Sequence, residues 1–320
     1  MNFDIELLNK EIQDYYSITK KNKKKPFFSD VLWKEYTFIT QNGIYIQKIL
    51  KDIPFYSYYF HCFQEFTMVD FPEKNSKEVI LKYFSGKKIY FNDYFINLDN
   101  ILHNNLELHN NLEFKKKFIQ NLVLSFEFLL NSIIQLNKKR ICYFQWSTEN
   151  IYFNEKDQPI LENFDNSIEY QNISIINPLL LKTKTFHKNQ PLEVFILYYM
   201  IKYEYETLSS SSLEEIYKNI TFTTISYQDF ISLYQPLINL PKKTIFMKLT
   251  SFIETWDNYG LCSIYLEFIE KIILHSAFDT KFHFLPKWRA LLKKNTSNDP
   301  FMREKLQVTE ERFQQIISTF

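Results

Sequence analysis

A single stripe of apolar side chains limits the fold of this chain more than any other feature of its sequence. Between residues 114 and 134, large apolar residues recur at steps of three and four, which is the period of one face of an α-helix. The stripe consists of Phe114, Phe118, Ile119, Leu122, Phe126, Leu129, Leu130, Ile133 and Ile134. We therefore expect a long helix at the centre of a hydrophobic core.

The same segment is not expected to span a membrane. Its most apolar part, Phe118 to Leu136, is interrupted by an acidic residue, Glu127, and by several amide side chains. Residues 1–10 lack the apolar core of a signal peptide. The sequence therefore predicts an intracellular protein without a membrane span.

Composition favours an ordered globular chain with no strong electrostatic preference for a partner. At 320 residues, with 45% hydrophobic and 23% charged residues, the chain can bury a sizeable core, as one large two-lobed domain or as two smaller domains. Its 38 basic and 37 acidic residues nearly cancel, which gives no global reason to expect a nucleic-acid or membrane partner. The three cysteines, Cys62, Cys142 and Cys262, are widely spaced, so we expect buried free thiols in a reducing compartment. The six histidines lie at no metal-ligand spacing.

Shorter patterns predict an α+β fold that is β-rich at its N-terminal end and mostly helical elsewhere. The expected strands run over residues 14–20, 27–38, 61–71 and 78–84. The expected helical segments run over residues 4–13, 43–60 with an interruption at Pro54, 191–203, 213–219, 227–234, 255–274, 285–292 and 309–318. The lysine-rich run at 20–25 is interpreted as a solvated hairpin tip rather than a phosphate-binding strip, because no aromatic or glycine residue accompanies the lysines.

The stretch that follows the central helix has the spacing of a phosphoryl-transfer centre. A protein kinase carries a catalytic-base Asp in H-R-D-x-x-x-x-N, a metal-binding Asn five residues later, and a second metal-binding Asp, in D-F-G, thirteen residues beyond that Asn. In this chain Gln145 stands at the base, Asn150 at the metal-binding Asn, and Asn163 at the D-F-G Asp. Tyr143 and Phe144 stand at the His and the Arg. The spacing is present and the charge is absent.

Further landmarks in the same order give the chain, over residues 20–320, a resemblance to the protein kinases, and more narrowly to the divergent serine/threonine kinases encoded by large DNA viruses. Residues 31–34 resemble the kinase V-A-I-K strand, whose phosphate-pairing lysine would be Lys34. Asp257 resembles the Asp of the kinase F helix, which holds the catalytic-loop backbone. Arg303 ends a D-P-x-x-R turn and could pair with Glu193, in a segment that echoes A-P-E.

The resemblance implies a two-lobed fold. The expected division is a reduced, β-rich N-lobe with one helix over residues 1–85 and a helical C-lobe over residues 86–320. The C-lobe would contain the degenerate catalytic loop and an enlarged activation-segment region. The segment between Asn163 and Asp257 is far longer than in a typical kinase, and the sequence assigns it no role.

Departures from the family pattern bear on function. With three glycines in the chain, the Gly-rich loop that covers the phosphates in a kinase cannot form. Residues 43–53 contain no Glu to pair with Lys34. Gln145 is never ionised and cannot accept a proton as a carboxylate does. Ser147 replaces the Lys that steadies the transferred phosphoryl group, and Asn163 offers Mg²⁺ a single neutral oxygen.

Each candidate position also has a structural interpretation. Gln145 and Asn163 can be ordinary loop amides. Asn150 can be a residual cation or nucleotide ligand, or it can close the loop through hydrogen bonds from its side chain to the backbone. Lys34 can contact a nucleotide or can be an exposed lysine on a strand. Asn150 and Asn163 are metal ligands only if the site has kept a cation.

Three hypotheses follow. In the first, the chain is a catalytically inactive pseudokinase without a cofactor that acts as a scaffold for a protein partner, in the host cytoplasm, a virus factory or the virion. The aromatic content of 18% favours it, because aromatic side chains beyond the needs of the core are available for an interface. In the second, it is an active atypical kinase that uses ATP and Mg²⁺ with a substitute carboxylate, Asp157, Glu162 or Asp165. In the third, it is a helical structural protein without kinase descent.

Overall fold

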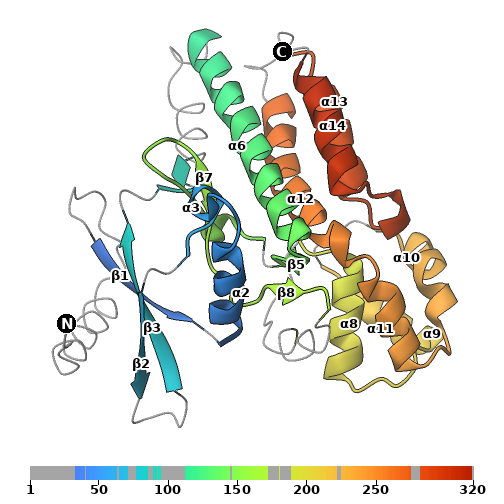
Figure 1. Ribbon diagram of the computed structural model, residues 1–320. Coiled ribbons are helices and arrows are strands. Elements are labelled where there is room, and N and C mark those ends of the chain that lie inside the picture. Colours follow the sequence, from blue (N-terminus) through green and yellow to red (C-terminus); the bar gives the residue numbers. More distant parts are fainter. Residues whose placement is uncertain are drawn as a thin grey trace, which may run out of the picture. The chain divides into compact units, whose positions relative to one another are not determined.

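A computed structural model of the chain shows a mixed fold that is mostly helical, as the sequence predicts (Figure 1). The structure describes residues 33–39, 41–62, 65–70, 77–85, 89–91, 93–94, 112–144, 146–171, 180, 189–221, 225–274 and 282–318. The predicted helix at 4–13, the predicted strand at 14–20 and the lysine-rich run at 20–25 lie outside these residues. The chain forms two compact units, one from residues 1–41 and 63–88 and the other from residues 42–62 and 89–320.

The smaller unit contains an antiparallel sheet of three strands in the order β1-β3-β2. Its strands are β1 (Trp33–Ile39), β2 (Glu65–Asp70) and β3 (Lys77–Ser85). The strands predicted at 61–71 and 78–84 are confirmed as β2 and β3. Lys34 lies on β1, opposite Phe84 of β3.

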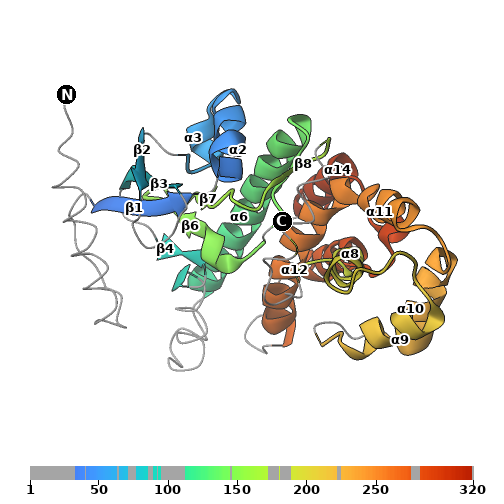
Figure 2. The same ribbon diagram turned by 90° about the horizontal axis from the view of Figure 1, so that it is seen from below.

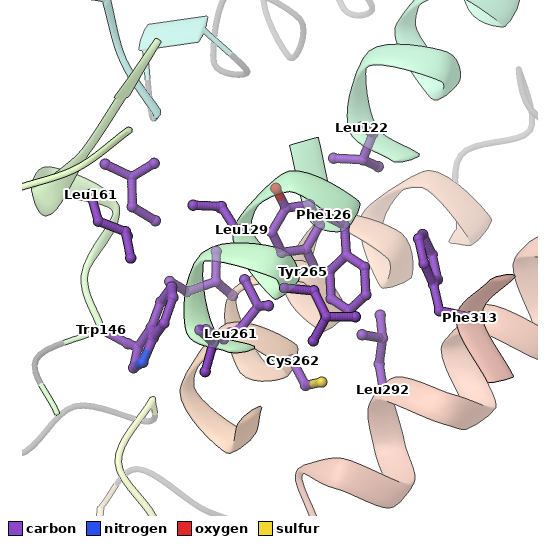
Figure 3. Packing of buried hydrophobic residues seen from close by; sticks show 14 of the residues in the cluster. Leu122, Phe126, Leu129, Trp146, Leu161, Leu261, Cys262, Tyr265, Leu292 and Phe313 are labelled. Atoms are coloured by element: carbon purple, nitrogen blue, oxygen red, sulfur yellow. The ribbon is translucent and has the colours of Figure 1, made fainter. Parts of the chain in front are cut away.

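The larger unit is organised around the long helix α6 (Leu112–Lys138), which confirms the central helix expected from the apolar stripe. Three helices pack beside it, α12 (Ile253–Leu274), α13 (Leu285–Asn295) and α14 (Leu306–Ile317) (Figure 1). The rings of Phe126 and Phe313 are 4.6 Å apart, and those of Phe126 and Tyr265 are 5.0 Å apart. Figure 3 shows these aromatic side chains meeting Leu292 and Cys262 in the core.

Part of α6, Lys115–Lys138, is the one candidate for a membrane span among the described residues, judged by length and composition. In the structure, 61% of its most apolar window is buried inside the protein. Burial of this kind is typical of the central helix of a folded domain, which is the role that α6 has here.

A second hydrophobic core lies around α8 (Leu192–Lys202), which is buried on nearly all sides. The helices α9 (Ser210–Lys218), α10 (Tyr227–Tyr234) and α11 (Lys242–Thr250) gather beside it (Figure 2). The prediction for α10 is confirmed residue for residue. The helix expected at 213–219 begins three residues earlier, at Ser210. Ser209 caps α9 by accepting a hydrogen bond from the backbone of Ser212, whose own side chain bonds back to Ser209.

Residues 42–62 belong to the larger unit, although the predicted division at residue 85 places them with the N-terminal strands. They form α2 (Gln41–Lys51, which begins one residue before this unit) and the short α3 (Tyr56–Tyr59), separated at Pro54 as expected. The side chain of Asn42 donates hydrogen bonds to the backbone oxygens of Asp165 and Ser167, at 3.0 and 2.9 Å. The start of α2 is therefore fixed to the segment that follows Asn163.

Short strands frame the loop that carries most of the candidate residues. Strand β5 (Ile141–Cys142) pairs with β8 (Ile168–Glu169), and β6 (Ile151–Phe153) pairs with β4 (Ile89–Tyr90) and β7 (Pro159–Leu161). The loop runs from β5 to β6, and a further turn runs from β7 to β8. Because β5 pairs with β8, the first connection begins close to where the second ends. Because β6 pairs with β7, the first connection ends close to where the second begins.

Candidate functional site

A buried carboxylate, that of Asp257 on α12, supports the loop between β5 and β6. Asp257 is 2% exposed. It accepts hydrogen bonds from the backbone N–H groups of Tyr143 and Phe144, at 2.7 and 3.0 Å, and from the indole nitrogen of Trp146 at 2.8 Å. The thiol of Cys142 also faces it, at 3.6 Å. One side chain therefore accepts hydrogen bonds from four residues between Cys142 and Trp146.

The charge state of Asp257 reflects two opposing effects. Burial raises its pKa, because a charged carboxylate loses its hydration inside the protein. The hydrogen bonds that it accepts, above all from the backbone of Phe144, favour the charged form and oppose that rise.

Phe144 itself has a φ of 69°, a left-handed conformation that bulky residues rarely adopt. The contacts with Asp257 hold the loop in this conformation.

Trp146 and Gly260 explain how the loop approaches α12 so closely. A Cβ atom added to Gly260 would lie 2.3 Å from Cδ1 and 2.4 Å from Cγ of Trp146, far inside normal contact distance. Trp146 is 2% exposed. Its indole nitrogen donates to Asp257, which lies one turn before Gly260 on α12. Glycine is needed at this helical position because the indole of Trp146 occupies the space that a side chain would fill.

We expect Gly260→Ala to destabilise the protein by about 2 kcal/mol, although alanine is the better helix former by about 1 kcal/mol. The clash has to displace Trp146 and weaken its hydrogen bond to Asp257. Urea denaturation followed by circular dichroism measures the change. In a Trp146→Ala background the same substitution should cost less, because the two shortest contacts are with the indole ring and only the contact with Cβ of residue 146, at 2.7 Å, remains. A Gly260→Ala variant as stable as the parent would contradict this close approach.

Tyr143 links the loop to the segment after β7. Its ring is fully buried and lies edge-on to Phe164, with centroids 5.3 Å apart. Its hydroxyl donates a hydrogen bond to the backbone oxygen of Glu162. Burial raises the pKa of Tyr143 well above the ordinary value, so the hydroxyl remains a proton donor. Ser167 adds a hydrogen bond from its hydroxyl to the backbone oxygen of Tyr143, at 3.3 Å.

The structure brings Asn150 and Asn163 into direct contact. The amide nitrogen of Asn163 donates a hydrogen bond to the side-chain oxygen of Asn150, at 3.3 Å. The backbones also meet, because the N–H of Glu162 donates to the backbone oxygen of Asn150 at 3.0 Å. Ser147 caps the 3₁₀ turn η1 (Thr148–Asn150) by accepting a hydrogen bond from Glu149 N–H. The spacing in the sequence therefore corresponds to a real pairing of two amides.

Two candidate residues cannot be placed in this site. Gln145 lies outside the described residues. Lys34 is placed only through its backbone on β1. Their expected roles, as the degenerate base position and as a nucleotide-binding lysine, stay predictions.

The three substitute carboxylates of the atypical-kinase hypothesis differ in position. Asp157 lies in the tight turn between β6 and β7, where it interacts with Tyr94. Glu162 and Asp165 flank Asn163 and Phe164 in the chain. Among the described residues, no group of three or more His, Cys, Asp or Glu side chains could hold a metal ion.

The ion pair expected between Glu193 and Arg303 is present. Both side chains are fully buried, and the guanidinium binds both carboxylate oxygens, the second at 3.0 Å. Burial alone would lower the pKa of Arg303, but the Glu193 carboxylate raises it above the ordinary value. Arg303 also donates to the backbone oxygen of Ser297 and lies over the ring of Tyr259. The pair connects α8 to α12 and to the turn after α13.

Three contributors to the site were missed in the sequence. Two of them, Trp146 and Gly260, are in close contact with each other. A glycine inside an apolar helical stretch is a sign of close packing, but it does not show which residue occupies the space. Asn42 binds the backbone of the segment after Asn163, and no pattern in the sequence marks that role.

Comparison with models of known families matches none of them to this chain, and comparison with curated proteins finds no significant relative.

Proposed function

We propose that this chain is a catalytically inactive, kinase-like protein of two lobes that acts as an intracellular binding scaffold. The observation that carries the proposal is the contact between Asn150, at the end of the loop that Asp257 supports, and Asn163, in the turn between β7 and β8. At these two positions a kinase would hold metal ions through an Asn and a carboxylate. Here both side chains are neutral amides that bond to each other.

The chemistry of the site supports an inactive protein. A positioned general base contributes on the order of 10²–10⁴-fold in rate, and Gln145 cannot act as one. Ser147, at the position of the phosphate-binding lysine, uses its hydroxyl to cap a 3₁₀ turn. Three separate contributions to phosphoryl transfer, the base, the phosphate cation and the metal carboxylate, are therefore replaced by neutral groups.

Exposed aromatic side chains support a role in binding. Phe55 and Phe301 are 83% and 82% exposed. Phe55 also has a φ of 58°, a costly conformation for a bulky residue. The ring of Phe301 contacts Phe252, and Met302 beside it is 55% exposed. Exposed aromatic and methionine side chains are enriched in protein interfaces.

A phosphotransfer assay tests the proposal. We expect the purified chain, incubated with radiolabelled ATP and either Mg²⁺ or Mn²⁺, to label neither itself nor generic protein substrates above a reaction without protein. Labelling that disappears in Gln145→Ala would refute the inactive scaffold and favour the atypical kinase.

Thermal denaturation with nucleotides tests whether the chain binds ATP or ADP. A ligand at about 100 times its dissociation constant stabilises a protein by roughly 2.7 kcal/mol, which is a shift of a few degrees for a chain of this size. We expect no metal-dependent shift with ATP or ADP. A shift that requires Mg²⁺ and vanishes in both Lys34→Ala and Asn150→Ala would show that the chain still binds nucleotide.

A further inference from the structure

We propose that the hydrogen bond between Asn163 and Asn150 stands in place of a divalent cation, so that the segment of residues 162–167 keeps its conformation without metal. This inference rests on the proposed function and adds how an inactive site is kept in shape. It concerns a link between two neutral side chains, which can be converted into a cation site by changing one atom of Asn163.

The donor set of the pair disfavours a cation. Mg²⁺ and Mn²⁺ prefer anionic oxygen ligands, and both side chains are neutral amides. The oxygen of Asn150 already accepts a hydrogen bond from Asn163, at 3.3 Å. A cation at that oxygen would meet the N–H group of Asn163, which carries a partial positive charge. A cation bound between the two side chains would therefore require the amides to separate first.

Other uncharged contacts hold the same segment. The Tyr143 hydroxyl donates to the backbone oxygen of Glu162, and the Glu162 N–H donates to the backbone of Asn150. At the other end, Asn42 binds the backbone oxygens of Asp165 and Ser167. The segment is thus tied at its start, at Asn163 and at its end by groups whose charge does not change with metal concentration.

The backbone at Asn163 supplies matched variants. Its φ of 62° lies in the left-handed region, which Asn, Asp and Gly adopt most readily. Asn163→Asp keeps the shape of the side chain but replaces the amide N–H group with a carboxylate oxygen beside Asn150. Asn163→Gly removes the side chain and keeps the backbone unstrained. Neither variant should disturb the fold through its backbone.

The test is Mn²⁺ binding to the purified full chain, followed through the electron paramagnetic resonance signal of free Mn²⁺ and through melting temperature. We expect the parent and Asn163→Gly to bind no Mn²⁺ that depends on Asn150. We expect Asn163→Asp to bind one Mn²⁺ and to melt about 2–3 °C higher at ten times its dissociation constant. Both gains should disappear in Asn163→Asp combined with Asn150→Ala.

Two results would overturn the inference. One is Mn²⁺ binding by the parent chain that Asn150→Ala removes. The other is a folded Asn163→Asp variant that binds no Mn²⁺. If Asn163→Asp does not fold, Asn163→Gly decides: hydrogen exchange at residues 162–167 should accelerate by about fivefold or more, and unchanged exchange would count against the link. Phosphotransfer decides the proposed function separately, so a chain that transfers phosphate but takes up no Mn²⁺ at Asn150 would refute only the inactive scaffold.

Discussion

Glu193→Ala is expected to lower the free energy of unfolding by about 3–5 kcal/mol, the usual cost of removing one partner of a buried ion pair. The guanidinium of Arg303 would then remain fully buried without its carboxylate. Its other contacts, with Ser297, Thr255 and the Tyr259 ring, are to neutral groups and cannot compensate a charge. Chemical denaturation followed by circular dichroism measures the loss.

Two comparisons separate this effect from a general loss of side-chain contacts. Glu214→Ala removes a carboxylate from an ion pair with Lys218 of similar length, 2.8 Å, whose side chains are 51% and 68% exposed. It should change stability by no more than about 0.5 kcal/mol. The double variant Glu193→Ala and Arg303→Met should cost less than the sum of the single changes, because no unpaired charge remains. A Glu193→Ala cost equal to that of Glu214→Ala would show that burial does not govern this pair.

Elements with a strong apolar period could be predicted from the sequence. The apolar stripe predicted α6, and the pattern over residues 227–234, which ends before Pro236, predicted α10. Both signals act locally along the chain. Helix α11 was missed because it begins directly after Pro241 and buries only Ile245, Leu249 and Thr250. Strands of two residues, such as β5 and β8, carry too few residues for any period and are defined only by their pairing.

The candidate site was predictable where it depends on spacing and unpredictable where it depends on tertiary approach. Their spacing along the chain singled out Asn150 and Asn163 as possible metal ligands, but it gave no indication that their amides bond to each other. The ion pair of Glu193 and Arg303 was anticipated from the resemblance alone, since 110 residues separate its members. The indole of Trp146 reaches Asp257 only because α12 has no side chain at Gly260, and that depends on how the two elements pack.

Replacing Asp257, which accepts the hydrogen bonds of the loop, should have the second large effect on stability. Asp257→Ala is expected to destabilise the protein by about 3 kcal/mol, because it leaves two backbone N–H groups and the Trp146 indole N–H buried without an acceptor. The loss is smaller than three separate hydrogen bonds would suggest, because the variant no longer has to bury a carboxylate, the group whose pKa burial raises. Denaturation measures the total, and hydrogen exchange at Tyr143 and Phe144 shows whether the loop opens first.

Asp257→Asn is the matched control because it changes one atom. One oxygen of Asp257 accepts from Phe144 and Trp146, and the other accepts from Tyr143. An asparagine that keeps its oxygen at the first position retains two of the three bonds and sets its NH₂ group against the N–H of Tyr143. We expect a loss between zero and that of Asp257→Ala, about 1–2 kcal/mol, with faster exchange mainly at Tyr143. Equal exchange at Tyr143 and Phe144 in this variant would mean that the carboxylate acts through its charge rather than through two separate oxygen atoms.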